Sequence, residues 1–555
     1  MTEGTARLPV VLLWHMHQPQ YRDALTGQYV LPWTYLHAIK DYTDMAAHLE
    51  ANPAARAVVN FTPVLIEQLE ELAERVTAHL RYGNPLPDPV LALLGPGAIT
   101  EEPAQRLALL QACLRAQRTQ MIERFGPFLE LATIAETLAT PARIAYASDT
   151  LIHDLAVWYH LAWLGETVRR ADSRVAALTD QGRNFTAQQR NELLTLIAEL
   201  LRSVVPRFKA LRERGQCELS MTPYGHPLMP LLIDLNSARE AMPDVDLPRH
   251  ERYEGGAARA EYHLRHGIEV FTRAFGAPPE GCWPSEGAIS RATLEMLDRF
   301  GFRWMASSAG VLRSGQPGAS PFEAYALPGS RMRCYFRDDG LSDRIGFTYA
   351  TWHGDDAARN LVSELGQLAG SLAQQPGRAV LIALDGENAW EHYPFNGYYF
   401  LKALYSELAS HPQIELTTLG ECAARGLEPR PLASVVAGSW VHATLATWIG
   451  DPDKNAAWDL LCEAKEMFDR HALSLDEPQR MAAERQLALC ESSDWFWWFG
   501  DYNPPQAVRQ FDELYRRQLV VLYRMLRVEP PASLANPLSV GRGSPEHGGV
   551  MRRAS

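Results

Sequence analysis

Two carboxylates lie where polar segments directly follow apolar ones. Asp385 ends the apolar run 379–384, and Glu286 follows a Trp-Pro-Ser turn after a short apolar stretch at 281–283. Partial burial beside such segments raises the pKa of a carboxyl group, which suits a proton donor. Two facing carboxylates, one acting as nucleophile or base and the other as acid, can cleave a glycosidic bond. Because the chain has 66 acidic residues, a pair of solvated surface groups is the alternative.

Tryptophans accompany these carboxylates. An indole can cover the flat C–H face of a pyranose ring while its N–H binds a hydroxyl. The segment 494–501, Asp-Trp-Phe-Trp-Trp-Phe-Gly-Asp, places three of the 14 tryptophans within four positions, and we interpret it as a loop that presents a sugar platform. Packing in the core is the alternative for each ring. The tryptophans in or beside the loops expected to meet sugar are Trp283, Trp390, Trp440, Trp495 and Trp498.

Histidines provide a competing signal. His15 and His17 are separated by one residue at the end of an apolar run, so on a strand they point the same way and could hold a divalent metal. With carboxylates from neighbouring strands they would form a hydrolytic metal site, as in barrel deacetylases. We favour hydrogen bonding of both side chains, and of His226 beyond the strand at 217–221, to sugar hydroxyls.

The elements that must position these residues are short, unbroken apolar runs separated by helical stretches. Unbroken runs are typical of strands buried on both faces of a parallel sheet, and their alternation with helices predicts an α/β barrel. In such folds polar groups at the carboxyl ends of the strands converge on one mouth. The runs that we expect to form strands are 9–14, 57–61, 217–221, 303–307, 379–384 and 414–417.

Domain boundaries are expected where this alternation of strands and helices changes. Residues 1–435 are expected to form the barrel domain, with a helical insertion at about 101–214. A helix beginning after Thr186 is marked by the capping box Thr186-x-x-Gln189. Residues 436–528 predict a C-terminal helical domain that contributes to the substrate cleft, with helices at 454–471, 477–491 and 505–526. The Pro-, Gly-, Ser- and Arg-rich segment 529–555 predicts a disordered tail.

Composition excludes several classes of protein. The net charge of −13 argues against nucleic-acid binding, which requires a basic face. No apolar segment is long enough to span a membrane, and the acidic start with a short apolar run does not resemble a signal peptide, so we expect a cytoplasmic protein. Seven scattered cysteines without a C-x-x-C pair argue against structural disulfides and a zinc finger. The sequence does not define an oligomeric state.

Five short motifs, in order, resemble the signature regions of glycoside hydrolase family 57. They are 17–19 (His-Gln-Pro), 215–218 (Gly-Gln-Cys-Glu), 283–286 (Trp-Pro-Ser-Glu), 385–388 (Asp-Gly-Glu-Asn) and 494–495 (Asp-Trp), and the resemblance extends from about residue 9 to about 505. It implies an α/β fold with an incomplete (β/α)7 barrel followed by an α-helical domain. It also implies a retaining mechanism without cofactor or metal, in which Glu286 is the nucleophile and Asp385 the acid/base. His17, Glu218 and Asp494 would shape the donor sugar subsite.

Within the family, the stretches 31–42 and 438–455 look most like those of α-amylases and amylopullulanases. The expected substrates are α-1,4-glucans (starch, glycogen and maltooligosaccharides), with α-1,6 bonds as a further target in the amylopullulanase case. A 4-α-glucanotransferase or branching enzyme would use the same catalytic pair. A metal-dependent deacetylase-like hydrolase and a non-catalytic glucan-binding protein are the alternatives from other classes.

Overall fold

Seven parallel strands form a closed barrel in the computed structural model, which describes residues 7–372, 375, 377–426 and 428–543. Each strand pairs in parallel with its neighbour, and the ring closes where Arg337 pairs with Leu381. The predicted (β/α)7 barrel is confirmed. In order around the ring, the strands are β1 (Leu8–Met16), β2 (Ala57–Phe61), β3 (Cys217–Met221), β4 (Gly281–Cys282), β5 (Trp304–Ser308), β7 (Arg333–Arg337) and β8 (Val380–Asp385).

Three further strands extend the sheet outside the ring. The strand β9 (Ile414–Leu416) pairs in parallel with the first residues of β1. The strand β6 (Tyr325–Ala326) pairs antiparallel with β7, and β10 (Arg430–Pro431) pairs in parallel with β6. The six strands expected from the sequence correspond to β1, β2, β3, β5, β8 and β9. The strands β4, β6, β7 and β10 were not predicted.

Side-chain alternation along the strands separates two cores. In β1, Val10, Leu12 and Trp14 face the surrounding helices, whereas Val11 and Leu13 face the barrel interior. The same alternation continues to the carboxyl ends, so the strands present inward-facing side chains in layers. The register places Leu13 level with Val58, Ala383 and Glu218, and places His15 one layer higher, level with Asn60, Asp385 and Ser220.

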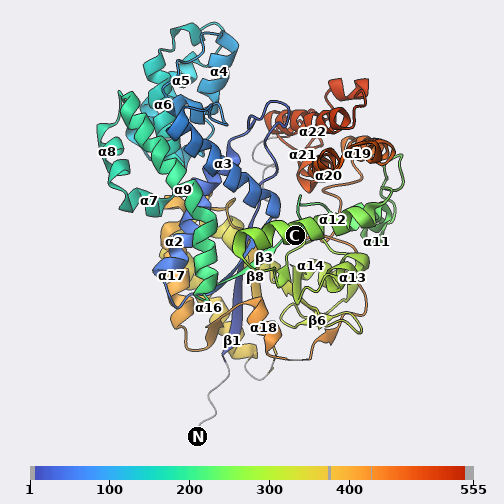
Figure 1. Cartoon of the computed structure of the whole chain (residues 1–555). Coiled ribbons are helices and arrows are strands. Elements are labelled where there is room, and N and C mark those ends of the chain that lie inside the picture. The colour runs from blue at the N-terminus through green and yellow to red at the C-terminus, as the bar shows by residue number, and fades with distance from the viewer. Residues whose placement is uncertain (1–6, 373–374, 376, 427, 544–555) are drawn as a thin grey trace.

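Helices cover the outside of the barrel (Figure 1). The helix α12 ends at Gly276, whose φ of 83° provides the left-handed C-cap that the Gly-Ala-Pro sequence predicts. Outside the insertion and the C-terminal region, the helices are α1 (Trp33–His37), α2 (Thr43–Ala51), α3 (Pro63–Tyr82), α10 (Met229–Ile233), α11 (Ala238–Ala241), α12 (Gly256–Phe275), α13 (Arg291–Arg299), α14 (Ala309–Gly315), α15 (Asp339–Asp343), α16 (Gly354–Leu372), α17 (Tyr398–Ser410) and α18 (Leu419–Ala424).

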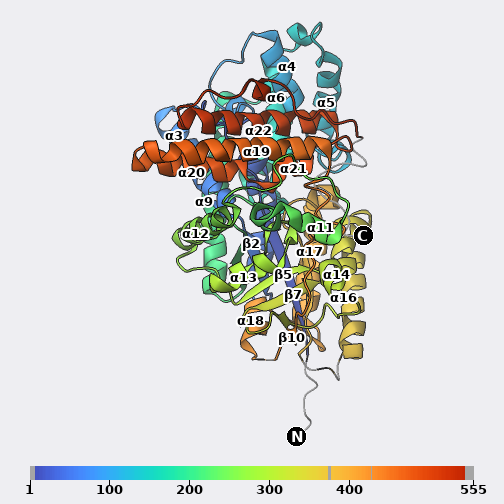
Figure 2. The same ribbon diagram turned by 90° about the vertical axis from the view of Figure 1, so that its right-hand side faces the viewer.

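The helices α4 to α8 of the insertion and the C-terminal helices lie beyond the carboxyl ends of the strands, whereas α9 runs back along the barrel toward β3 (Figures 1 and 2). The capping box of Thr186 and Gln189 is present at the start of α9. The insertion contains α4 (Pro103–Ala112), α5 (Gly126–Leu138), α6 (Asp149–Ala162), α7 (Glu166–Ala171), α8 (Ser173–Gln181) and α9 (Ala187–Glu213). The C-terminal region contains α19 (Pro452–His471), α20 (Glu477–Cys490), α21 (Ser493–Trp498) and α22 (Pro505–Met525).

The first part of the segment expected to be a disordered tail is folded against α22. Leu534 and Ser539 are buried, and the backbone N–H groups of Leu538 and Ser539 donate to the carboxylate of Asp512. The prediction of disorder is therefore wrong for residues 529–543, because a few apolar and hydrogen-bonded positions suffice to anchor a Pro-rich segment. The remainder, 544–555, lies outside the described residues. No helix in the described part of the chain is long and apolar enough to cross a membrane.

Candidate active site

A cleft with an open volume of about 1470 Å³, including its mouth, lies at the carboxyl ends of the barrel strands. Its walls come from all three parts of the chain: the barrel loops, the insertion through Trp163, and the C-terminal helices through Asp494 and Trp498. Eight of the twelve predicted site residues line it: His15, His17, His226, Glu286, Asp385, Trp440, Asp494 and Trp498. The predicted contribution of the C-terminal helices to the cleft thus has a geometric basis.

Asp385 ends β8 in the uppermost inward-facing layer of the barrel. Burial raises the pKa of its carboxyl from the usual value of 3.8 to about 6, while a hydrogen bond from Asn388 Nδ2 at 2.8 Å and the charges of His17 and Arg337 act in the opposite direction. A carboxyl group with this pKa is still partly protonated near neutral pH. It can therefore deliver a proton to a leaving oxygen.

Glu286 lies in a strained turn after β4. Its φ of 57° places a non-glycine residue in the left-handed region, which costs about 1–2 kcal/mol. Two hydrogen bonds from Trp440 hold this turn: the backbone N–H donates to the Glu286 carbonyl at 3.0 Å, and the indole Nε1–H donates to Oε2 at 2.9 Å. The indole N–H thereby fixes the direction of Oε2 in the cleft, where the carboxyl group is placed to act as a nucleophile.

Glu387 is a second buried carboxyl beside Asp385, and it was quoted in the sequence motif without being predicted as a site residue. Its Oε1 accepts hydrogen bonds from the His17 backbone N–H, Gln18 Nε2 and Tyr42 Oη. Burial, and then the charge of Asp385, raises its pKa well above the usual value. Its Oε2 has no hydrogen-bond partner among the described residues, so a protonated Glu387 can donate to a bound ligand.

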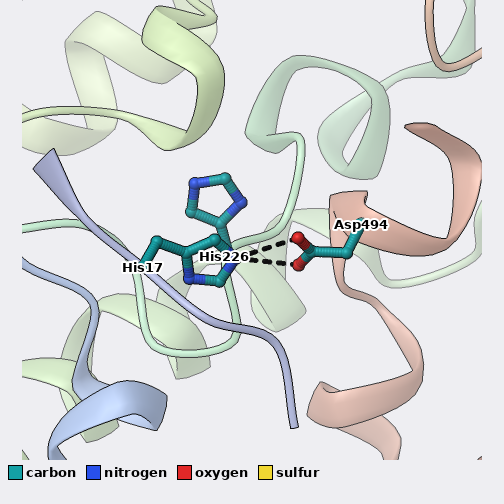
Figure 3. Close-up of side chains that lie close together, drawn as sticks. All are labelled: His17, His226 and Asp494. Atoms are coloured by element: carbon teal, nitrogen blue, oxygen red, sulfur yellow. Dashed lines mark hydrogen bonds and ion pairs between the residues drawn. The ribbon is translucent and has the colours of Figure 1, made fainter. Parts of the chain in front are cut away.

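Three side chains from distant parts of the chain meet at one wall of the cleft (Figure 3). His17 Nε2 lies 2.9 Å from Asp494 Oδ2, and the His17 and His226 rings stack with their centroids 3.8 Å apart. One nitrogen of each histidine and one oxygen of Asp494 lie within 4.8 Å of one another, a spacing that could hold a metal ion. For the metal-dependent alternative, which the sequence places at His15 and His17, the geometric candidates are therefore His17 and His226.

The hydrogen bonds of the histidines indicate which tautomers they adopt. His15 Nδ1 lies 2.7 Å from Asn60 Oδ1, an acceptor that also binds the Thr222 hydroxyl, so Nδ1 carries the proton and Nε2 accepts. His226 Nε2–H then donates to His15 Nε2 at 3.2 Å, and His226 Nδ1 accepts from the Ser493 hydroxyl at 2.7 Å. Burial lowers the pKa of His15 to about 3 and lowers the pKa of His226 well below the usual value of a histidine, so both rings are neutral. A metal would have to displace one of these bonds to reach His226.

The tryptophans divide into two groups. Trp440 and Trp498 line the cleft, so the rings of these two tryptophans are available to a ligand. The Trp498 ring also stacks on Phe511, with the ring centroids 4.7 Å apart. The prediction of sugar contact is wrong for Trp283, Trp390 and Trp495, which are fully buried and do not line the cleft.

These three buried rings instead support the site. Trp390 Nε1 donates to the Gly386 carbonyl, which steadies the loop after Asp385, and Trp283 packs edge-on against Trp440. Trp495 Nε1 donates to the Leu489 carbonyl. The segment predicted as an aromatic loop is the helix α21, and a helix directs consecutive aromatic side chains to different sides.

Glu218 is also misplaced by the prediction. It is the second residue of β3, level with Leu13 and therefore one layer below His15 and Asp385. Its carboxylate accepts hydrogen bonds from Trp304 Nε1 at 2.6 Å and from the Gly420 backbone N–H at 2.8 Å, toward the amino end of the barrel. Ser220 occupies the layer of the site in β3. Glu218 does not line the cleft, so a role in the donor sugar subsite is wrong.

Several cleft residues were missed. Arg337 ends β7, donates to the Ala383 carbonyl and lies over the ring of Trp440 at 4.7 Å. A signal for it existed, since a polar residue at the end of a short apolar run matches the pattern that identified Asp385. Trp497 lies in the aromatic segment 494–501 that the sequence singled out, whereas the other aromatic residues of the lining carried no such signal: Trp33, Trp163 and Phe511.

The fold and the cleft together define a barrel enzyme with paired carboxylates and aromatic walls, an arrangement suited to glycosyl chemistry. The chain belongs to Glycosyl hydrolase family 57, whose model matches residues 11–435. The protein is therefore an enzyme of a glycosidase or glycosyl-transferring type, and the suspected family is confirmed, while the α-amylase and amylopullulanase group is not resolved by the match.

Solved structures share the fold. A branching enzyme from Pyrococcus horikoshii is 15% identical with a TM-score of 0.58, covering 99% of each chain. A branching enzyme from Thermococcus kodakaraensis is 14% identical with a TM-score of 0.57, covering 93% of this chain and 90% of that one. An α-amylase from Thermotoga maritima is 14% identical with a TM-score of 0.56, covering 94% and 96%. Comparison with curated proteins found no match.

Proposed function

We propose that the protein hydrolyses α-1,4-glucans with retention of configuration, through a covalent glycosyl-enzyme. The observation that carries this proposal is that Glu286 and Asp385 line the same cleft, the first oriented by an indole N–H and the second kept partly protonated by burial. An oriented carboxyl group and a proton donor are the two groups that a retaining mechanism needs. Membership of the family supports the same assignment.

In the proposed mechanism Glu286 attacks the anomeric carbon while Asp385 protonates the leaving glycosidic oxygen. The carboxylate of Asp385 then takes a proton from water, which attacks the same carbon and releases Glu286. His17 Nδ1 and Glu387 Oε2, each without a partner among the described residues, supply an acceptor and a donor for the hydroxyls of the sugar. No step requires a cofactor.

Product analysis tests this proposal directly. The wild-type enzyme is expected to release short maltooligosaccharides from amylose, with products of the α configuration, and to do so equally in the presence of EDTA. Assays on pullulan in parallel will show whether α-1,6 bonds are also cleaved. Loss of activity in EDTA, with recovery on adding one divalent metal, would instead support the metal-dependent alternative at His17, His226 and Asp494.

A glucanotransferase is the second candidate, because the stacked pair of Trp498 and Phe511 forms an apolar wall that could bind an acceptor sugar in place of water. The first half-reaction is the same. Incubation with maltotriose alone distinguishes the two: hydrolysis yields only shorter sugars, whereas transfer also yields longer ones.

The proton-donor role of Asp385 predicts a specific pH dependence. Because its pKa is raised to about 6, the protonated acid is present below this pH and is lost above it, so kcat/KM should fall as the pH rises through about 6. Asn388→Ala removes the hydrogen bond that favours the carboxylate. Its alkaline limb is expected to lie at higher pH than that of the wild type.

The measurement is the pH profile of kcat/KM on a maltooligosaccharide. Asn191→Ala, an exposed position on α9, is the control and should leave the profile unchanged. An Asn388→Ala profile that coincides with the wild type, or moves to lower pH, would show that another group governs the alkaline limb.

A further inference from the structure

Three exposed aromatic side chains lie close together outside the cleft. Trp352, Phe395 and Tyr399 are 40%, 39% and 38% exposed. The rings of Phe395 and Tyr399 are 5.5 Å apart. The start of α16, two residues after Trp352, approaches α17 so closely that a Cβ on Gly354 would lie 3.0 Å from Tyr399 Cβ. Large exposed rings that gather in this way mark a binding surface more often than single exposed residues do.

Both segments that carry these rings begin in the wall of the cleft. Phe347, in the turn η7 (Arg344–Thr348), lines the cleft, and the turn η8 (Tyr349–Thr351) leads from it to Trp352. Glu391, in the turn η9 (Trp390–His392), also lines the cleft, and the turn η10 (Pro394–Gly397) leads from it to Phe395 and Tyr399. Because η8 and η9 contact each other, the exposed rings continue the rim of the cleft outward.

Two arginines of the insertion hold the aromatic side chains in place. The Arg124 guanidinium lies over the Phe395 ring at 4.5 Å, and Arg170 lies over Tyr399 at 5.2 Å while donating to its hydroxyl at 3.1 Å. Both arginines are ion-paired with the buried carboxylate of Glu166. A surface fixed in this way loses little side-chain entropy when a ligand stacks on it.

The backbone that presents Phe395 is strained. Phe395 and Asn396 both have φ of 55°, the left-handed region, which a bulky residue such as Phe adopts only at a cost. Asn396 is fixed by hydrogen bonds with Lys40 and Asp44. Although Arg124 lies over its ring, Phe395 remains 39% exposed, so the strained turn gains little core packing in return, and such strain is concentrated at binding sites.

We propose that Trp352, Phe395 and Tyr399, the rim surface, bind the part of an α-glucan chain that extends beyond the catalytic cleft. This inference rests on the proposed function. The C–H faces of successive glucose units would stack on the rings, and the Arg170 guanidinium would donate to their hydroxyls. The rim surface would therefore favour long chains over short ones, which end inside the cleft.

The test compares long and short substrates in the variant Trp352→Ala/Phe395→Asn/Tyr399→Ala. Asn replaces Phe395 because it tolerates the left-handed region and so preserves the turn. KM for amylose is expected to rise about tenfold or more, while kcat for amylose and both constants for maltotriose stay within about twofold. Retardation of the variant in a native gel containing amylose should also be lost. Tyr146→Ala, which removes another exposed ring, is the control and should behave as the wild type.

Unchanged KM and gel retardation with amylose, in an enzyme that still turns over both substrates, would overturn the rim surface and leave the proposed function standing. An equal loss with amylose and maltotriose would also overturn it, since the three residues would then serve only to attach the insertion to the barrel. The single variant Trp352→Ala leaves the contacts of Arg124 and Arg170 intact, so it tests the surface without loosening the insertion. A rise in KM for amylose alone in this variant would support the rim surface, and unchanged KM for both substrates would contradict a contribution of Trp352. If the wild type cleaves neither substrate, the proposed function itself fails. The rim surface would then still be supported if amylose retards the wild type and Tyr146→Ala in the gel but does not retard the triple variant.

Discussion

Replacement of Glu286 by Gln is expected to lower kcat on amylose and on maltooligosaccharides by about 10⁴-fold or more, because the amide cannot form the glycosyl-enzyme. Gln has the same length and can adopt the same strained turn. The indole N–H of Trp440 can still donate to its amide oxygen, so the local structure is preserved. The steady-state rate, the melting temperature and binding of an unhydrolysed oligosaccharide are the three measurements.

Glu280→Gln is the matched control, since Glu280 lies at an exposed position just before β4 and pairs with Arg303. It should retain wild-type turnover. A Glu286→Gln enzyme that kept more than a small fraction of wild-type activity, with the same melting temperature, would contradict the nucleophile assignment. Loss of binding together with turnover would point to a defect in the cleft.

Asp385→Ala is expected to reduce turnover of unactivated glucans by about 10²–10⁴-fold, because the leaving oxygen no longer receives a proton. A maltooligoside with a nitrophenyl leaving group needs no such proton, so it should still form the glycosyl-enzyme and accumulate it. Azide, a nucleophile that requires no general base, should then release the sugar as the glycosyl azide with retained configuration. A burst of nitrophenol followed by azide-dependent turnover is the measurement.

The equivalent change at the neighbouring carboxyl, Glu387→Ala, is the control for this experiment. Glu387 is placed to bind sugar rather than to transfer the proton, so azide should not rescue its defect. If azide rescued Glu387→Ala and left Asp385→Ala inactive, the roles of the two carboxyls would be exchanged.

Much of the barrel could be predicted because its strands are buried on both faces. Such strands appear as unbroken apolar runs, and β1, β2, β3, β5, β8 and β9 all carry this signal. The strand β4 has only two residues, Gly281 and Cys282, which is too short for any periodicity to show. The strand β7 has an arginine at each end, Arg333 and Arg337, so only its three central residues form an uncharged run.

The site was predictable where a polar residue stands at the carboxyl end of an apolar strand, as Asp385 and His15 do. Glu218 failed because sequence shows that a residue lies in a strand but not how high it stands in the barrel, which depends on register with β1 and β2. The tryptophans failed for a different reason. Trp283 and Trp390 are close in sequence to the carboxylates, yet their side chains point into the core, and only packing determines that direction.

The pairing of His17 with Asp494 joins residues 477 positions apart. Synthesis proceeds from the amino terminus, so every strand of the barrel has been made before the partner of His17 exists. Until then the stack of histidines lacks both Asp494 and the Ser493 hydroxyl that His226 requires. This wall of the cleft is therefore completed only when the last helices dock, and a chain that ended before residue 493 would leave both histidines without these partners.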